Sequence, residues 1–303
     1  MIVVRLSGGL GNQLFQYAAG RALSARVDSD LVLDLSWFGE RHWQTTRRSY
    51  ELSHYPIRAR VLGPGELERR ILYTHPLLKR LPWPVGWRPL RLVRQSHSGF
   101  DSSFGDLPDD VFLDGYWQSS RFFGSVSADV RREATTDVPV TAEDAEVNAA
   151  IATSESVCIH VRRGDYVTLR GAARTHGALS PAYYQRAIAR VIEAVPSPHF
   201  FVFSDDPEWT RENIRVDAPV RYVTHNTPAA AHRDLRLMSA CRHQIVANSS
   251  LSWWSAWLNS NPAKIVIAPE PWFRRDDLTD LVPDQWVRVL NDTCDLRRRG
   301  AAK

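Results

Sequence analysis

The chain has 303 residues, of which 44% are hydrophobic and 10% aromatic, so it can bury one large core or two medium ones and is not disordered. Its formal net charge of +4 suits an anionic ligand. That charge falls short of the clustered basic surface of a nucleic-acid-binding protein, so we expect no nucleic acid as a partner. Two α/β domains of about 150 residues each are the simplest expectation for this length.

Cysteine usage favours a reducing compartment. The three cysteines, Cys158, Cys241 and Cys294, are odd in number and far apart in the sequence, which argues against a disulfide framework. None has the CxxC spacing of a zinc site. The N-terminal stretch lacks the leader of a signal peptide, and no apolar run approaches the length of a membrane span. We therefore expect a cytoplasmic protein.

The N-terminal residues predict a strand, a glycine loop, a helix and a second strand. The strands are expected at 2–6 and 31–35, and Asp34 lies at the end of the second. The helix between them carries apolar residues at helical spacing, namely Phe15, Ala18, Ala19 and Ala22. This order is the first unit of a parallel, doubly wound sheet.

Residues 56–110 are rich in Pro, Arg and Trp and show weak periodicity, so we interpret them as an insertion in the first lobe. The basic residues Lys79, Arg80, Arg88, Arg91 and Arg94 are interleaved with Trp83 and Trp87, with no acidic residue among them. This composition fits peripheral contact with an anionic membrane surface. It also fits a solvated insertion that packs its tryptophans on the first lobe.

Strand and helix patterns alternate again after about residue 150, which predicts a second Rossmann-like lobe. Strands are expected at 157–161, 200–203, 221–223, 244–247 and 264–268, and helices at 182–194, from 207, 234–241 and 251–258. The polar, helix-prone segment 136–148 lies between the two patterns. We therefore place the lobes at 1–145 and 146–303.

The stretch VCIHVRRGDYV ends an apolar strand in charged residues. Ligands of open α/β sheets bind beyond the carboxyl ends of the strands, where His160, Arg162, Arg163 and Asp165 are expected to cluster. Two guanidinium groups could hold a diphosphate while Asp165 orients one of them. The alternative is a buried pair of Arg and Asp that ties the loop down.

Two further strands end in polar residues. In FFVFSDDPEW, Asp206 fits the N-cap of the following helix, which leaves Asp205 for a nucleobase, a ribose or a structural hydrogen bond. In HQIVANSSLSWWSAWL, the residues Asn248, Ser249 and Ser250 precede a helix whose N-terminus favours an anion.

Several common motifs are absent from the sequence. The glycine loop lacks the third glycine of a dinucleotide-binding fingerprint, because Leu14 stands at that position, which disfavours a dehydrogenase. No glycine-rich loop precedes a lysine, so a P-loop is excluded. No group of residues has convincing spacing for metal ligands, and we expect no metal site.

Six stretches resemble the bacterial α-1,2-fucosyltransferases of glycosyltransferase family 11 in their order and spacing. They are GGLGNQLFQYAAGRAL, DGYWQSSRFF, IHVRRGDYV, HGALSPAYYQRAI, FVFSDDPEW and DLRLMSACRHQIVANSSLSWWSAWLN. The resemblance spans residues 2–289, and its last stretch is the most specific. It implies a GT-B-like fold with two Rossmann-like lobes and the donor site in the cleft on the C-terminal lobe.

The resemblance also implies an activity. The expected reaction is metal-independent, inverting transfer of L-fucose from GDP-β-L-fucose to O2 of a terminal β-galactoside, with no cofactor. The enzyme would act in surface-polysaccharide or O-antigen synthesis at the cytoplasmic membrane face. Two other readings stay open: a fucosyltransferase with another acceptor or linkage, and a non-catalytic protein of this fold that binds nucleotide sugars or glycans.

More distant fucosyltransferases suggest roles for individual residues by the same resemblance. Arg162 would hold the β-phosphate, Asp205 would read guanine, and His160 would lie near the nucleotide. The glycine loop would face phosphate and fucose through Gly9, Asn12 and Gln13. Ser249 and Ser250, with the start of their helix, would then help Arg162 to stabilise the departing diphosphate.

The group that takes the proton from the acceptor hydroxyl stays open. His176 in the HGALS stretch and Asp34 at the end of the second strand are the first candidates, and Asp114 is the third. Dissociative transfer without a side-chain base is an equal alternative.

Overall fold

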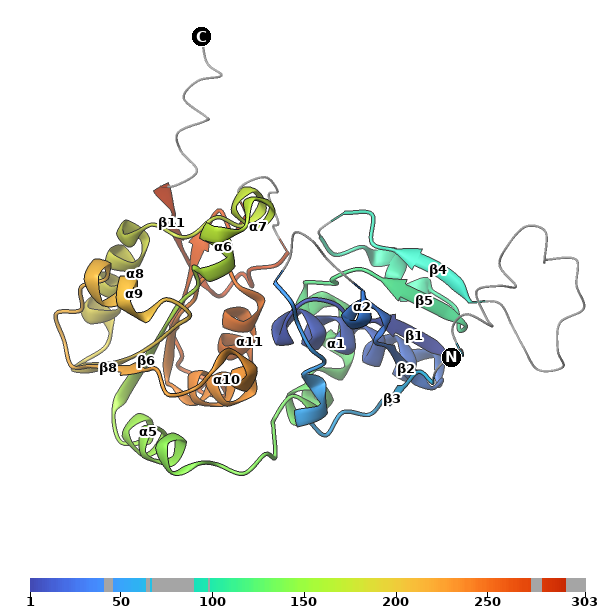
Figure 1. Ribbon diagram of the computed structural model, residues 1–303, viewed down its shortest axis with the longest axis horizontal. Coiled ribbons are helices and arrows are strands. Elements are labelled where there is room, and N and C mark those ends of the chain that lie inside the picture. Colours follow the sequence, from blue (N-terminus) through green and yellow to red (C-terminus); the bar gives the residue numbers. More distant parts are fainter. Residues whose placement is uncertain (41–45, 64–65, 67–89, 98, 274–279, 293–303) are drawn as a thin grey trace, which may run out of the picture. The chain divides into compact units, whose positions relative to one another are not determined.

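The computed structural model describes residues 1–40, 46–63, 66, 90–97, 99–273 and 280–292. They group into two compact units: the first holds the described residues up to Thr135 except Thr46, and the second holds Thr46 and the described residues from Thr136 onward. Each unit is built on its own parallel sheet, as Figure 1 shows. The prediction of two Rossmann-like lobes is therefore confirmed.

The first unit has a five-stranded sheet in the order β3-β2-β1-β5-β4, with every pairing parallel. The strands are β1 (Ile2–Arg5), β2 (Leu31–Asp34), β3 (Arg60–Val61), β4 (Arg91–Arg94) and β5 (Val111–Asp114). The helices are α1 (Leu10–Val27), α2 (Ser36–Gly39) and α4 (Ser127–Glu133). Short 3-10 turns are η1 (Leu52–His54), η2 (Ser102–Asp106), η3 (Ser120–Phe122) and η4 (Gly124–Val126).

Helix α1 packs closely against this sheet. A Cβ atom on Gly20 would lie 2.3 Å from Cγ2 of Val4 in β1 and 2.9 Å from Cδ1 of Leu31 in β2. Only a residue without a side chain allows that approach. This contact sets how closely α1 packs against β1 and β2.

The second unit has a six-stranded parallel sheet in the order β11-β10-β9-β6-β7-β8. Its strands are β6 (Glu155–Val161), β7 (Pro198–Ser204), β8 (Val220–Val223), β9 (His243–Ile245), β10 (Val266–Glu270) and β11 (Val287–Leu290). Its helices are α5 (Ala142–Ala152), α6 (Gly164–Thr168), α7 (Arg170–Thr175), α8 (Pro181–Ala194), α9 (Pro207–Asn213), α10 (Ala231–Ala240) and α11 (Ser250–Leu258), with the turn η5 (Pro228–Ala230).

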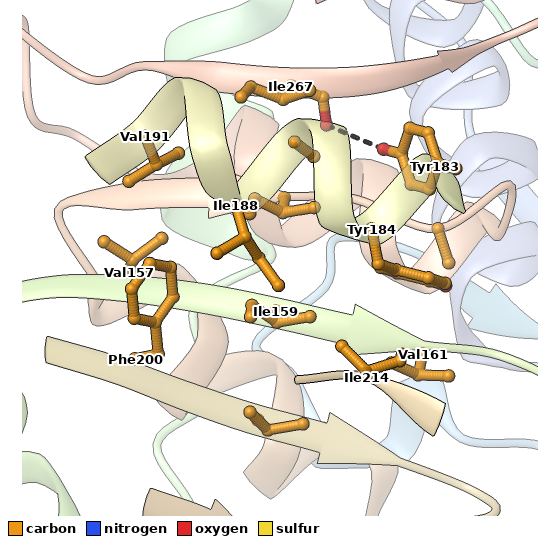
Figure 2. Close-up of a cluster of buried hydrophobic side chains, with 14 of the residues drawn as sticks. Val157, Ile159, Val161, Tyr183, Tyr184, Ile188, Val191, Phe200, Ile214 and Ile267 are labelled. Carbon is orange, nitrogen blue, oxygen red and sulfur yellow. Dashed lines mark hydrogen bonds between the residues drawn. The ribbon is translucent and has the colours of Figure 1, made fainter. Parts of the chain in front are cut away.

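Alternate residues of β6 face opposite sides of this sheet. Val157 and Ile159 pack against Ile188 on α8, and Figure 2 shows this side of the core. The Tyr183 hydroxyl donates to the Val246 carbonyl at 2.6 Å. Cys158 lies on the other side, in a cluster that includes residues of α5 and α10. Burial on both sides explains the nearly continuous apolar sequence of the strand.

Residues 56–110, which we interpreted as an insertion with weak periodicity, include two strands of the first sheet. They contain β3 and β4, and Arg91 and Arg94 belong to β4, an edge strand parallel to β5. These strands are short and mostly exposed, so they lack the apolar run that identifies a buried strand. The insertion residues Lys79, Arg80, Trp83, Trp87 and Arg88 lie outside the described residues.

Within the described parts of the chain, no helix is both long enough and apolar enough to traverse a bilayer. Cys158 and Cys241 are buried free thiols, and Cys294 lies outside the described residues. Across the same parts of the chain, no group of three or more acidic, histidine or cysteine side chains has a geometry that could hold a metal ion.

Candidate active site

Three loops of the second unit meet at the carboxyl edge of its sheet. They follow β6, β7 and β9, which are neighbours in the order β9-β6-β7. Arg162 follows β6, Asp205 follows β7, and Asn248 follows β9. The parallel pairing therefore brings together the polar residues that the sequence predicted at three separate strand ends.

Arg162 is held between two carboxylates. Its guanidinium donates to Oδ1 of Asp165 at 2.8 Å and pairs with Oδ2 of Asp205 at 2.9 Å. Burial alone would lower the pKa of Arg162, but Asp205 and Asp165 raise it above its ordinary value. The side chain stays partly exposed, at 21%. A fixed positive charge therefore lies at the strand end.

Asp205 fixes the loop that carries Arg162. Its carboxylate accepts the backbone N–H groups of Arg163 at 2.8 Å and Gly164 at 3.1 Å. A Cβ atom on Gly164 would lie 2.8 Å from Oδ2 of Asp205, so this close contact needs glycine. The structural alternatives that we kept for these residues are both present: the pair of Arg162 and Asp165, and hydrogen bonds that the Asp205 carboxylate accepts from the loop.

Replacement of Asp205 can distinguish a structural role from recognition of guanine. If the chain binds GDP, as the family resemblance implies, we expect Asp205→Ala to weaken that binding by about tenfold, because the loop loses two hydrogen bonds and Arg162 loses a partner. If the carboxylate also reads guanine, the loss will be larger for GDP than for a nucleoside diphosphate without the guanine amino group. Calorimetric titration of both ligands measures the difference. If the variant binds both ligands as tightly as the wild type does, Asp205 neither holds the loop for the nucleotide nor reads guanine.

The side chain of Arg163 has other partners than that of Arg162. Its Nε donates to Asp206 at 3.2 Å, and its guanidinium lies 3.6 Å from the ring centroid of Trp209 on α9. Asp206 also caps α9, as predicted, by accepting the backbone N–H of Trp209. Of the two guanidinium groups expected to hold a diphosphate, that of Arg162 pairs with Asp165 and Asp205, whereas that of Arg163 is engaged by Asp206 and Trp209.

The loop that follows Arg162 is fastened to the end of β9. The Asn248 side-chain amide donates to the carbonyls of His176 at 3.1 Å and Gly177 at 3.0 Å. The Tyr166 hydroxyl donates to the Asn248 carbonyl at 3.0 Å, and the Tyr166 ring stacks on His176 at 4.8 Å. Asn248 is 1% exposed, so its first role is to position His176.

Burial lowers the pKa of both histidines at this edge. The pKa of His176 falls to about 4, with Asp165 raising it and Arg162 lowering it further. The pKa of His160 falls to about 3 through burial and the charge of Arg162. Both rings are neutral at pH 7. His176 is therefore a neutral imidazole at that pH, and its role as proton acceptor stays a prediction.

Helix α11 begins at Ser250, with Ser249 at its N-cap. Ser249 makes no capping hydrogen bond with its side chain, and the first backbone N–H groups of a helix have no partner inside the helix. The N-terminus of α11 thus offers N–H groups and two hydroxyls to an anion. It lies at the end of β9, next to the strand that carries Arg162.

In the first unit, the glycine loop joins β1 to α1. Gly8 has a φ angle of +73°, which favours glycine. Gln13 is fully buried, and its amide donates to the carbonyls of Gly8 and Ser49 at 3.0 and 2.8 Å. Both of its N–H donors are therefore engaged within the chain, so Gln13 holds the loop in place.

Asn12 and Gly9 border the same loop. Oδ1 of Asn12 accepts a hydrogen bond from Gln118 at 2.9 Å, and Asn12 is only partly buried. A Cβ atom on Gly9 would lie 3.8 Å from the Arg48 guanidinium, so this loop also faces a positive charge.

Asp34 and Asp114 lie at the carboxyl edge of the first sheet, and both have partners. Asp34 is 3% exposed and accepts hydrogen bonds from the backbone N–H and the hydroxyl of Ser36, each at 3.0 Å. Asp114 pairs with Arg94 at 3.4 Å. Asp34 thus closes the turn into α2.

Comparison with known proteins places the chain in a family. Residues 95–289 match the sequence model of a protein family, Glycosyl transferase family 11. The chain is 34% identical over 296 residues to an alpha-1,2-colitosyltransferase of Escherichia coli, with 95% of this chain and 99% of that protein covered. The chain belongs to glycosyl transferase family 11.

Other relatives of this family 11 glycosyltransferase carry related names. The O-antigen biosynthesis glycosyltransferase WbnK of Escherichia coli is 32% identical, with 94% of this chain and 99% of that protein covered. Galactoside alpha-(1,2)-fucosyltransferase 1 of Plecturocebus brunneus is 29% identical, with 57% of this chain and 48% of that protein covered. Among solved structures, NodZ alpha-1,6-fucosyltransferase co-crystallised with GDP has a TM-score of 0.49 at 14% identity, with 88% of this chain and 94% of that chain covered.

Two supporting residues of the family 11 chain were missed in the sequence. Tyr166 joins three parts of the site, and Gln16 braces the glycine loop. The Gln16 amide donates to Oγ of Ser7 at 2.9 Å and accepts the Ser7 N–H at 2.9 Å. Gln13 and Gln16 are three residues apart, so they share one face of α1. That spacing in GNQLFQ could have indicated a paired role.

Proposed function

We propose that this family 11 glycosyltransferase transfers L-fucose from GDP-β-L-fucose to O2 of a terminal β-galactoside, with inversion and without a metal ion. The observation that supports the proposal most is Arg162, held with a permanent charge at a strand end next to the uncapped N-terminus of α11. Both features suit a diphosphate.

The proposed chemistry gives these groups a specific task. As the bond between fucose C1 and the diphosphate oxygen breaks, negative charge grows on the β-phosphate. Arg162 would stabilise that charge by hydrogen bonds that strengthen in the transition state. The N–H groups and hydroxyls at Ser249 and Ser250 would add to this effect. Asp165 and Asp205 would keep Arg162 in position before the donor arrives.

A second candidate donor is a nucleotide-linked colitose. The relative with 34% identity is named a colitosyltransferase, and colitose is L-fucose without its 3-hydroxyl. The same diphosphate-binding groups would serve either donor. The difference would lie in whether the site contains a partner for that hydroxyl, because a site built to hydrogen-bond it would discriminate strongly against the deoxy sugar.

The test offers GDP-fucose and GDP-colitose to the purified chain, with lactose or a Galβ1,3-GalNAc glycan as acceptor, and determines the linkage of the product. Faster turnover of GDP-fucose into a product linked through O2 of galactose supports the proposal. Preference for GDP-colitose supports the second candidate. Another linkage indicates a different acceptor specificity, and binding without transfer indicates a non-catalytic protein.

We also propose that the acceptor is a lipid-linked or lipopolysaccharide precursor, met by the enzyme at the cytoplasmic membrane face. The support is the name of the relative WbnK, an O-antigen biosynthesis glycosyltransferase. Flotation of the protein with vesicles that contain anionic lipid, compared with neutral vesicles, tests the peripheral contact.

A further inference from the structure

A hollow lies at the carboxyl edge of the first sheet, beyond the ends of β4 and β5, which are neighbouring strands (Figure 1). Its volume is about 310 Å³, including the space at its opening. All the residues that line it belong to the first unit. Ligands of open α/β sheets bind at this edge, and the volume lies at the lower end of the range for small-molecule sites. The hollow therefore suits one ring rather than a longer chain.

The wall of the hollow has an apolar part and a polar part. The apolar part comes from Val93, Phe104, Leu107 and Trp117. The Trp117 ring packs against the Phe104 ring, with 5.2 Å between their centroids. Ligand pockets are typically lined in this way, by apolar and aromatic side chains with a few polar groups that orient the ligand.

The loop that carries Trp117 is held in a fixed conformation. Oε1 of Gln95 accepts the backbone N–H groups of Tyr116 at 3.0 Å and Trp117 at 2.9 Å. Trp117 has a φ angle of +54°, in the left-handed region that is uncommon for a bulky residue. Strained backbone of this kind persists only where the surrounding structure holds it, and it is concentrated at active sites and ligand-binding sites. Gln95 therefore presets the wall of the hollow before a ligand enters.

The polar part of the wall offers both acceptors and donors. Hydrogen bonds from the side chain and backbone of Ser103 lower the pKa of Asp101 below its ordinary value, so its carboxylate is charged near neutral pH. Nδ1 of His97 accepts the backbone N–H of Gly99 at 3.4 Å, which leaves the N–H of the neutral ring at Nε2 as a donor. Arg94 adds a positive charge to the same wall. Charges of both signs suit a neutral ligand with several hydroxyl groups better than a phosphate, which Asp101 would repel.

Trp117 contributes one more polar group. The residue is 3% exposed, and among the residues that the structure describes its indole N–H has no hydrogen-bond partner. Buried indole N–H groups usually have a partner, and a ligand hydroxyl is a partner of the right kind. A sugar ring combines such hydroxyls with an apolar face of C–H groups, so it matches both parts of this wall.

Resting on the proposed function for the class of ligand, we propose that this hollow binds one sugar ring of the acceptor glycan. The apolar face of the ring packs on Trp117, and its hydroxyls bind Asp101 and His97. The role of the hollow is to bind and select the acceptor, and no covalent step occurs at these residues.

The test compares Ser103→Phe with Ser102→Phe in the full chain. Ser103 lines the hollow, so a phenyl ring there obstructs it, whereas Ser102 is its exposed neighbour in η2 and does not line it. Saturation-transfer NMR with lactose, without any donor, measures sugar binding. We expect Ser103→Phe to raise the Kd for lactose at least about tenfold, because the ring loses its contacts with the wall. Ser102→Phe should bind lactose as the wild type does, and thermal unfolding verifies that both variants fold.

A second pair of variants changes charge instead of shape. Asp101→Asn keeps the size of the side chain but removes the charged acceptor, so the Kd for lactose should rise by about tenfold. Asp106→Asn makes the same change at the exposed end of η2, outside the hollow, and should leave the Kd unchanged. In transfer assays the KM for lactose should rise with the Kd in Ser103→Phe and Asp101→Asn, while GDP affinity measured by calorimetry stays within about twofold.

Several outcomes separate this inference from the proposed function. Equal lactose affinity in the wild type, Ser103→Phe and Asp101→Asn would overturn the inference, and transfer by the wild-type chain would leave the proposed function intact. Binding of inorganic phosphate in the hollow in place of lactose would also overturn the inference. If lactose binds as expected but the wild-type chain transfers neither sugar, the hollow stands as a sugar site and the proposed function fails.

Discussion

Arg162→Ala should lower kcat at least about a hundredfold, the usual loss when one preorganised electrostatic donor is removed. The donor KM should change less than kcat, because the interaction strengthens as charge develops on the leaving diphosphate. Steady-state kinetics with GDP-fucose and a galactoside acceptor measure both quantities.

The size of this effect follows from the neighbours of Arg162. The guanidinium pairs with Asp165 and Asp205, so its removal leaves two carboxylates facing the position proposed for the diphosphate. The variant therefore loses the attraction between the guanidinium and the diphosphate, and the two carboxylates repel the diphosphate instead. Adding Asp165→Asn to Arg162→Ala removes part of that repulsion and should recover some of the lost turnover. Recovery of turnover without a change in the free energy of unfolding would separate this electrostatic effect from a structural role of the pair.

Two further variants complete this experiment. Arg162→Lys keeps the charge but cannot pair with both carboxylates as the planar fork does, so its turnover should lie between those of the wild type and the alanine variant. Arg215→Ala removes a cation from an exposed pair with Asp217 in the same unit and should leave kcat unchanged. A folded Arg162→Ala protein with nearly normal turnover would eliminate the proposed role of this residue.

The sequence predicts the second unit better than the first. Strands such as β6 and β7 are buried on both faces, so their apolar runs and the polar residues after them are visible in the sequence. The edge strands β3, β4 and β11 carry exposed or half-buried residues and lack that signal. The four-residue strand β5 was also missed, although it is nearly all buried, because so short an apolar run resembles a loop.

The candidate site, too, is predictable only in part from the sequence. The sequence predicts that Arg162, Asp205 and Asn248 lie at strand ends, because parallel pairing brings such positions to one edge. It does not predict the partner of each group. The contacts of Asp205 with the loop of Arg162, and of Asn248 with His176, depend on loop conformations.

Asn248→Asp should destabilise the second unit by about 3 kcal/mol at pH 8, although the two side chains have nearly the same shape. The Asn248 amide donates to the carbonyls of His176 and Gly177, and the residue is 1% exposed. A carboxylate there would lose two hydrogen bonds and face two carbonyl oxygens without a compensating charge. The loop would release His176, so glycosyl transfer should fall together with stability.

The pH dependence of this loss identifies its cause. Burial and the facing carbonyls would raise the pKa of the introduced carboxyl group in the folded state above its unfolded value of about 3.9. The protonated carboxyl group therefore destabilises the folded state least at low pH. The variant loses stability as the pH rises through the folded-state pKa of this group. Urea unfolding at pH 5 and pH 8 should show a larger difference from the wild type at pH 8. Asn213→Asp is the control, because the Asn213 side chain is exposed and donates to the Trp209 carbonyl. Its loss of stability relative to the wild type should be small at both pH 5 and pH 8. Equal losses for the two variants would show that the buried contacts of Asn248 do not hold this loop.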